Sequence, residues 1–142
     1  MKRKMRTEIL VKGSPLLAQK LANQILGRYP VEIVQKPHNS LVMMKVRENA
    51  QRSLFYLGEL VVTECKVKIQ QSFGLGIAQG HQSDLAYHLA IIDAAYRANL
   101  AEISSWEPLL EAEKNSIDQK ELINQKKILQ TKVNFDTMNI EI

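Results

Sequence analysis

The amino-acid sequence predicts an α+β fold: N-terminal helices, an antiparallel β-meander of about four strands, and C-terminal helices. Apolar residues recur at helical spacing in both end regions, whereas they alternate with polar residues between positions 31 and 78. The candidate strands are separated by short turns, which favours antiparallel pairing. The chain has 142 residues, of which 45% are hydrophobic and 24% charged, so we expect one domain spanning residues 1–142.

Two helices are predicted at the beginning of the chain. The first covers residues 2–11 and ends at Gly13. Ser14 then offers a hydroxyl N-cap, and Pro15 occupies the first helical position, where its missing N–H costs nothing. Apolar residues continue at helical spacing to Leu26, and Gly27 is a plausible C-cap for this second helix.

The middle of the chain has the periodicity of a sheet with one wet face. Residues 31–36 and 41–47 are predicted as two strands, with a turn at 37–39 between them and another at 48–51. Residues 61–70 form the longest predicted strand, and residues 73–78 a shorter fourth one. In the longest strand one face carries Val61, Thr63, Cys65, Val67 and Ile69, and mostly polar residues face the other way.

Helical spacing returns after Gly80. A helix capped by Ser83 or Asp84 is predicted to run to about Leu100, and Ser104–Ser105 can cap a further segment. Residues 111–132 are strongly polar, with only scattered apolar positions: Ile117, Leu122, Ile123, Ile128 and Leu129. So thin a stripe covers little surface, which favours a helix that lies against another subunit.

Charge and cysteine content narrow the functional classes. The formal net charge is +4, and four basic residues against Glu8 place +3 of it in the first eight positions. Such an arm could touch nucleic acid or an anionic surface, although a solvated tail is the simpler interpretation. The single cysteine excludes an internal disulfide. No signal-peptide or membrane-span pattern is visible, so a cytoplasmic protein is expected.

The glycines between the last predicted strand and the following helix are a weak phosphate-loop candidate. Gly74, Gly76 and Gly80 have the spacing G-x-G-x-x-x-G, one residue longer than the dinucleotide fingerprint, and no βαβ unit surrounds them. Backbone N–H groups there could cradle phosphate. Glycines required by a tight strand-to-helix turn are the favoured interpretation.

Catalytic candidates are few. Glu64, His81 and His88 are the best of them, and Asp84 lies four residues before His88, where its carboxylate could orient the imidazole. Nothing in their spacing forces these residues together, and no metal site is predicted. Cys65 on the apolar face of its strand is typical of a small core residue. Residue chemistry alone does not indicate an enzyme.

Several short motifs nevertheless occur in the order of a known family. Residues 55–59 (Phe-Tyr-Leu-Gly-Glu) lead into a long strand, and Gly74 and Gly80 precede a helix. In that helix Ala90, Ile92, Asp93 and Ala94 resemble the alanine, aliphatic and aspartate positions of a family motif. Residues 133–138 are similar to a closing V-[DN]-F-x-T-M segment. The chain thus resembles the PhnG family, the G subunit of the carbon–phosphorus lyase core complex. The matching positions are Gly58, Glu59, Thr63, Gly74, Gly80, Asp93, Val133, Phe135, Thr137 and Met138.

The sequence departs from that family pattern at polar positions. His81-Gln82 stands where the family has Arg-Asp, and residues 85–87 (Leu-Ala-Tyr) stand where it has His-Ala-Glu. Asp136 replaces a phenylalanine of the closing segment. These changes fit a subunit that is selected for packing and contacts.

The resemblance implies a role within an assembly. PhnG-like subunits associate with PhnH, PhnI and PhnJ, and with PhnL they support attack of methylphosphonate on C1′ of ATP. Adenine leaves, and α-D-ribose 1-methylphosphonate 5-triphosphate forms. ATP and methylphosphonate are then substrates of the complex, and the subunit itself needs no cofactor. Two alternatives are a nucleic-acid-binding module that uses the basic N-terminal arm and a stand-alone enzyme that uses the three catalytic candidates.

Overall fold

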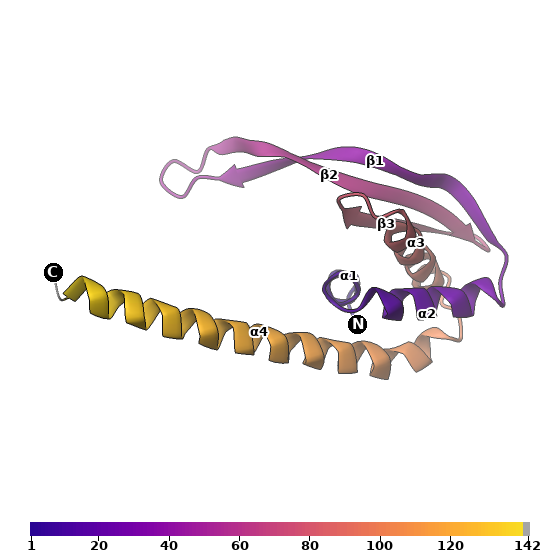
Figure 1. Ribbon diagram of the computed structural model, residues 1–142. Helices are drawn as coiled ribbons and strands as arrows, with labels where there is room; N and C mark the ends of the chain where they lie inside the picture. The colour runs from indigo at the N-terminus through magenta and orange to yellow at the C-terminus, as the bar shows by residue number, and fades with distance from the viewer. Residues whose placement is uncertain (141–142) are drawn as a thin grey trace.

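The computed structural model describes residues 1–140, with side chains through Thr131, and shows two helices, a sheet and two further helices (Figure 1). The predicted α+β order is confirmed. The elements are α1 (Arg3–Lys12), α2 (Pro15–Leu26), β1 (Val31–Arg47), β2 (Leu54–Ile69), β3 (Ser72–Gln79), α3 (Ser83–Arg97) and α4 (Ile103–Ile140).

The sheet has three antiparallel strands in the order β1-β2-β3, so the prediction of about four strands is wrong. The predicted turn at Pro37, His38 and Asn39 is part of β1. β1 lies at the edge of the sheet, where proline is tolerated, and register shifts on both sides of Gln35 accommodate the proline. The two predicted strands are therefore one strand of 17 residues.

The strands differ in length, and this divides the sheet into two halves. β1 pairs with β2 from Val31 to Arg47, whereas β3 pairs only with the part of β2 from Val62 to Ile69. We call this three-stranded part the packed half. Residues 41–61, in which β1 and β2 continue without β3, are called the projecting ribbon. Figure 1 shows the ribbon extending beyond β3 and beyond the helices α1, α2 and α3.

Helix α3 covers one face of the packed half, which we call the inner face. On β3, Gly74, Gly76 and Ala78 alternate toward α3 and are buried. The part of β2 in the packed half turns Thr63, Cys65, Val67 and Ile69 inward, and all four are buried, as the alternation predicts. The inner position Val61 is 37% exposed, because it lies where the helical cover ends.

Helix α4 is one continuous helix instead of two helical segments. Trp106 and Leu110, near its beginning, are fully buried, and the Trp106 indole N–H donates to the Gln24 side-chain oxygen at 2.8 Å. The hydroxyls of Ser104 and Ser105 bond back to the Ala101 and Glu102 carbonyls and do not cap the helix. From Glu121 to Thr131 every residue is exposed, and the helix leaves the body there (Figure 1).

Candidate functional site

A buried threonine joins the sheet to α3. The Thr63 hydroxyl lies 2.6 Å from the Gly80 carbonyl oxygen, to which it donates, and it accepts the Gln82 backbone N–H at 3.0 Å. Asn39 Oδ1 on β1 lies 3.3 Å from the same hydroxyl. Gly80 has φ = +79°, a backbone conformation that favours glycine. Gln82, and not the predicted Ser83 or Asp84, is the N-cap of α3, and its N–H is satisfied by β2.

Two glycines of β3 permit close packing against α3. A Cβ built on Gly74 would collide with the backbone at Ala90 and Ala94, and one on Gly76 with the backbone at Ala86. Of the three glycines interpreted as turn residues, only Gly80 lies in the turn. The small residues of β3 recur every second position and those of α3 every fourth, and this paired pattern is the sequence signal of the contact.

A buried carboxylate connects three elements. The Asp93 side chain on α3 accepts from Arg3 Nε at 3.0 Å and from Arg6 Nη2 at 3.2 Å, both on α1. It also accepts the Leu75 backbone N–H of β3 at 3.0 Å, and Arg97 Nε lies 3.6 Å away. Asp93 therefore holds α1 and the edge of β3 onto α3.

Arg6 is the buried member of this cluster. Burial lowers its pKa, and the neighbouring carboxylate of Asp93 partly opposes that shift. The guanidinium carbon lies 3.8 Å from the centroid of the Tyr96 ring, so the aromatic face covers the cation. Two of the four basic residues of the N-terminal arm, Arg3 and Arg6, thus bind within the fold. This role could not be deduced from a positive charge count.

The three catalytic candidates are distributed over different parts of the packed half. Glu64 lies on the outer face of β2, where His38 Nε2 is 3.5 Å from its carboxylate. His88 lies on α3, which covers the inner face, so the sheet separates it from Glu64. Burial lowers the pKa of His88, and the charge of Asp84 partly opposes this. His81 is exposed in the turn before α3.

No metal centre emerges from these groups. Among the described residues, no three His, Cys, Asp or Glu side chains are arranged to hold a metal ion. Cys65 is fully buried, and burial raises the pKa of its thiol. A catalytic role for Glu64, His81 or His88 stays a prediction to be tested by substitution.

The projecting ribbon exposes apolar side chains on both faces. Register and alternation place Leu41, Met43, Leu54, Tyr56 and Val61 on the inner face, where they are 37–59% exposed. The outer face carries Val42, Met44, Val46 and Phe55, which are 40–46% exposed. Gly58 and Glu59 of the family motif lie here, beside an irregularity in which Leu57 is the extra residue of β2.

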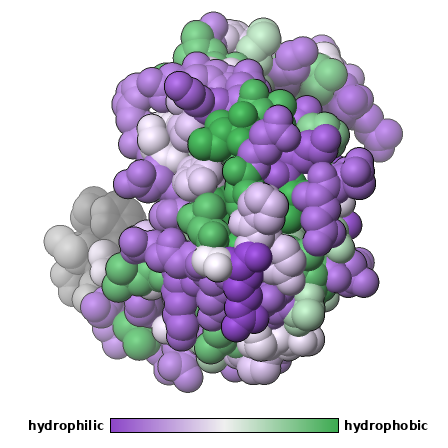
Figure 2. Space-filling view, turned by 90° about the vertical axis from the view of Figure 1, so that its right-hand side faces the viewer, coloured by the Kyte–Doolittle hydropathy of each residue, from purple (hydrophilic) through white to green (hydrophobic). Residues whose placement is uncertain are grey.

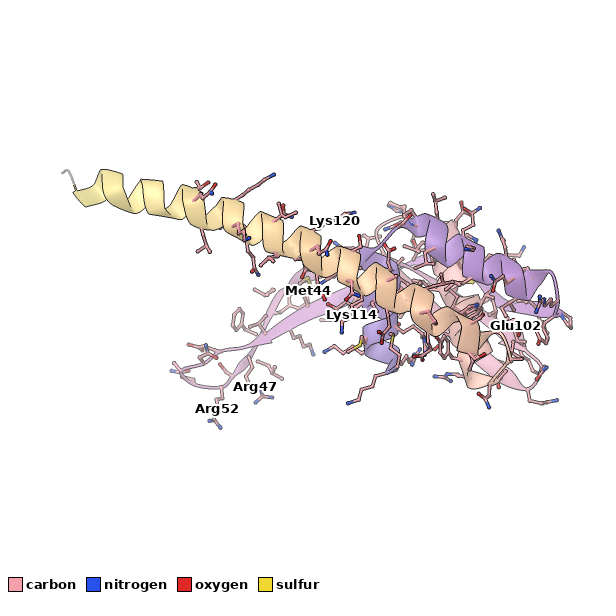
Figure 3. The ribbon with its side chains drawn as sticks, turned by 90° about the horizontal axis from the view of Figure 1, so that it is seen from below. Met44, Arg47, Arg52, Glu102, Lys114 and Lys120 are labelled. Atoms are coloured by element: carbon pink, nitrogen blue, oxygen red, sulfur yellow. The ribbon has the colours of Figure 1, made fainter. Side chains whose placement is uncertain are left out.

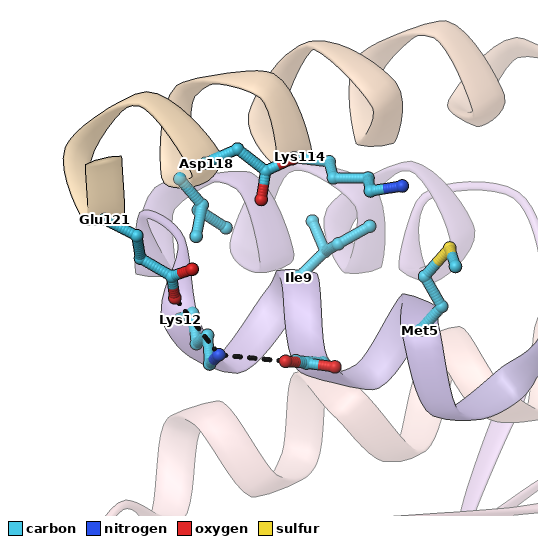
Figure 4. Close-up of a pocket in the computed structure, with 8 residues that line it drawn as sticks. Met5, Ile9, Lys12, Lys114, Asp118 and Glu121 are labelled. Atoms are coloured by element: carbon cyan, nitrogen blue, oxygen red, sulfur yellow. Dashed lines mark hydrogen bonds and ion pairs between the residues drawn. The ribbon is translucent and has the colours of Figure 1, made fainter. Parts of the chain in front are cut away.

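The junction of α1 and α4 is a shallow, mixed-charge pocket (Figure 4). Lys12 Nζ on α1 lies 2.8 Å from Glu8 and 3.2 Å from Glu121 of α4, as the dashed lines show. Met5 and Ile9 supply its apolar side. Exposed pairs of this kind contribute little energy. Among the described hydrogen bonds and ion pairs, the one between Lys12 and Glu121 is the bond to the body that lies farthest along α4.

The remaining motif positions lie at the end of α4. Val133, Phe135, Thr137 and Met138 belong to the helix, but their side chains lie outside the described residues. No helix in the described part of the chain is long and apolar enough to cross a membrane.

Comparison with known proteins identifies a family for nearly the whole chain. The model of the family described as "Phosphonate metabolism protein PhnG" matches residues 1–139. No curated protein matches the chain. The matched residues include the projecting ribbon. They also include Thr63, Gly74, Gly80 and Asp93, the motif residues that connect the elements of the packed half.

Proposed function

Because the chain belongs to the PhnG family of phosphonate metabolism proteins, we propose that it is an accessory subunit of a carbon–phosphorus lyase complex. In this proposal its sister chains are PhnH, PhnI and PhnJ, with PhnL joining for the reaction, and the complex is cytoplasmic. The assembly acts as a transferase: methylphosphonate attacks C1′ of ATP, and adenine leaves. The product is α-D-ribose 1-methylphosphonate 5-triphosphate.

The chain itself supplies contacts to this reaction and no catalytic group. ATP and methylphosphonate bind elsewhere in the complex. Two of the polar motif residues support this division, because Thr63 and Asp93 are occupied by hydrogen bonds within the fold. Such groups hold elements together and have little capacity left for a substrate.

The observation that carries the proposal is the apolar surface of the projecting ribbon. Soluble monomers rarely expose large contiguous apolar patches. Here ten large apolar side chains of one ribbon, spread over both faces, are at least 37% exposed. The exposed Leu122, Ile123, Ile128 and Leu129 on the departing half of α4 add a second such surface. Partner chains would bury both.

Co-expression tests this function. A tagged form of the full chain should co-purify with PhnH, PhnI and PhnJ of the same source in fixed proportion. With PhnL added, the assembly should release adenine from ATP when methylphosphonate is present, and omission of this chain should abolish that release. A chain that is monomeric, monodisperse and unable to capture its sisters would contradict the proposal, as would turnover by the chain alone.

A substitution series separates the accessory role from a catalytic one. Glu64→Ala, His81→Ala and His88→Ala are each expected to leave adenine release by the assembled complex at the wild-type rate. A variant that assembles normally but loses turnover would show that this chain contributes to the chemistry.

A further inference from the structure

We propose that the projecting ribbon inserts into an apolar cleft of a partner protein whose rim is acidic, so that the partner covers both faces of the ribbon and pairs with its cationic tip. This inference rests on the proposed function, since it specifies how the subunit is held. It assigns a docking role to residues 41–61.

The first reason is that neither face of the ribbon is polar enough to be a water-exposed face. In the packed half the outer face is mixed: β2 carries Glu64, Lys66 and Lys68 there, beside the exposed Phe73, Leu75 and Ile77 of β3. In the ribbon the outer face changes to Val42, Met44, Val46, Phe55 and Leu60. The inner face is apolar as well, apart from Lys45, Arg47 and Glu59. A partner that covered one face would leave the other apolar face in water.

The second reason is that the ribbon has little support from its own chain. A two-stranded hairpin is at best marginally stable in water, and a third strand or a packed layer is normally required. β3 ends at Gln79, which pairs with Val62, so the ribbon lies beyond the third strand. Figure 3 shows α4 and the ribbon leaving the body in different directions, and the apolar side chains on the inner face of the ribbon are 37–59% exposed. The missing layers must therefore come from outside this chain.

The third reason is the charge at the tip. Lys45, Arg47 and Arg52 outnumber Glu48 there, which gives a local charge of +2. Figure 3 shows Arg47 and Arg52 at the free end of the ribbon, with Met44 nearer the body. Arg47 donates to the Arg52 carbonyl at 3.2 Å, and Glu48 accepts from Ser53 at 3.3 Å. Within the described residues, none of the three cations has an ion-pair partner. Acidic side chains at the mouth of a cleft would complement them.

These features together favour a protein over other anionic partners. A membrane surface would take up one face of the ribbon, and a nucleic acid would offer phosphates without apolar cover for the aliphatic side chains. A protein cleft supplies apolar walls for both faces and carboxylates at its edge. Apolar anchors in desolvated pockets carry most of the energy of such interfaces.

The test compares charge insertions on each face with a matched insertion elsewhere. Leu41→Asp changes the inner face, where Leu41 is 59% exposed, and Phe55→Asp changes the outer face, where Phe55 is 46% exposed. Leu16→Asp is the control, because Leu16 on α2 is 70% exposed and lies away from the ribbon. The tagged full-length variants are co-expressed with PhnH, PhnI and PhnJ, and capture is quantified. Far-ultraviolet circular dichroism and thermal unfolding of each isolated variant confirm folding.

Both ribbon variants are expected to reduce affinity for the captured subunits by about tenfold or more, whereas Leu16→Asp should bind like wild type. The double variant Arg47→Glu/Arg52→Glu should also bind more weakly, and its binding should no longer weaken as salt is raised. Normal capture by either single-face variant would overturn insertion. Equal loss with Leu16→Asp would overturn the assignment to the ribbon.

Other outcomes point to a different occupant. If the isolated chain dimerises and Phe55→Asp makes it monomeric, the cover is a second copy, and the proposal of a cleft in another protein is wrong. Binding to anionic phospholipid vesicles that both ribbon variants abolish would equally overturn it. If wild type captures no sister subunit at all, the proposed function fails first. Capture by wild type and by every ribbon variant defeats this inference alone.

Discussion

The two halves of the β1–β2 pair are built alike but are used differently. Both alternate in the manner of strands, and the pairing runs through them with few irregularities. Yet β2 from Thr63 to Ile69 buries every inner residue, whereas the ribbon buries none. The difference comes from the neighbours: β3 and α3 cover one half, and the described chain offers nothing comparable for the other. Alternation of apolar and polar residues predicts a strand, but the neighbouring elements determine which face of that strand is buried.

The interactions that hold the helices and the sheet together are concentrated in the packed half. Thr63, Gly74, Gly76 and Asp93 each join the sheet to α3 or α1. The opposite end of the molecule, seen in Figure 2, is mostly hydrophilic with a narrow hydrophobic band. The packed half and its helices are expected to fold without a partner, whereas the ribbon is expected to need a partner to bury its apolar side chains.

Removing the Asp93 carboxylate should have the largest effect. Asp93→Ala leaves Arg6 buried without its counter-charge and leaves the Leu75 N–H unpaired, so we expect a loss of about 3–5 kcal/mol of unfolding free energy. Urea denaturation of the isolated chain measures it. Asp84→Ala on the exposed first turn of the same helix is the control, with a loss of at most about 1 kcal/mol. Equal effects would show that the three-element cluster does not hold the body.

Filling the space between β3 and α3 should come next. Gly76→Val places a side chain where the α3 backbone at Ala86 lies, and we expect about 2–3 kcal/mol of destabilisation from overpacking. Gly27→Ala is the matched control, because that glycine has helical φ and ψ and ordinary clearance around its Cβ. It should be neutral or slightly stabilising. A Gly76→Val variant as stable as wild type would mean that α3 can move away from the sheet without cost.

Thr63→Val tests how much the threonine hydroxyl contributes to holding the turn before α3, because valine has nearly the same shape as threonine. The substitution leaves the Gly80 carbonyl and the Gln82 N–H without the hydroxyl, and a loss of roughly 1–2 kcal/mol is expected. Thr7→Val serves as control, because Thr7 lies half-buried on α1, away from this turn. Amide hydrogen exchange at Gln82 should also accelerate in Thr63→Val. Unchanged protection there would remove the threonine from this role.

Local signals in the sequence predicted the elements better than their contacts. Ser14 and Pro15 marked the start of α2 correctly, and the Ser14 hydroxyl accepts the Leu16 N–H at 3.3 Å. The turn predicted at Pro37 was wrong, because an edge strand with shifted register tolerates a proline that would break a central strand. The continuity of α4 was missed, since neighbouring serines can bond to preceding carbonyls as readily as cap a helix.

The contacts within the site could not be predicted from the sequence, because they join residues that are far apart in the chain. Arg6 and Asp93 are 87 positions apart, and Thr63 and Gln82 are 19 apart, so neither pair follows from local spacing. The family motif did select Thr63, Gly74, Gly80 and Asp93 from sequence, but not what they do. Their structural roles became visible only when strand, turn and helix were placed together.

The same substitution, valine to alanine, in the packed half and in the ribbon tests whether the two halves differ in burial. Val67→Ala removes a fully buried side chain from the packed half and should cost about 2 kcal/mol. Val46 is 41% exposed on the ribbon, so Val46→Ala should cost less than about 1 kcal/mol in the isolated chain, mostly through strand propensity. In the assembled complex Val46→Ala should instead weaken association, because the same side chain is then desolvated. If it destabilises the isolated chain as much as Val67→Ala does, the ribbon already packs against its own chain, and the two halves do not differ in the way described.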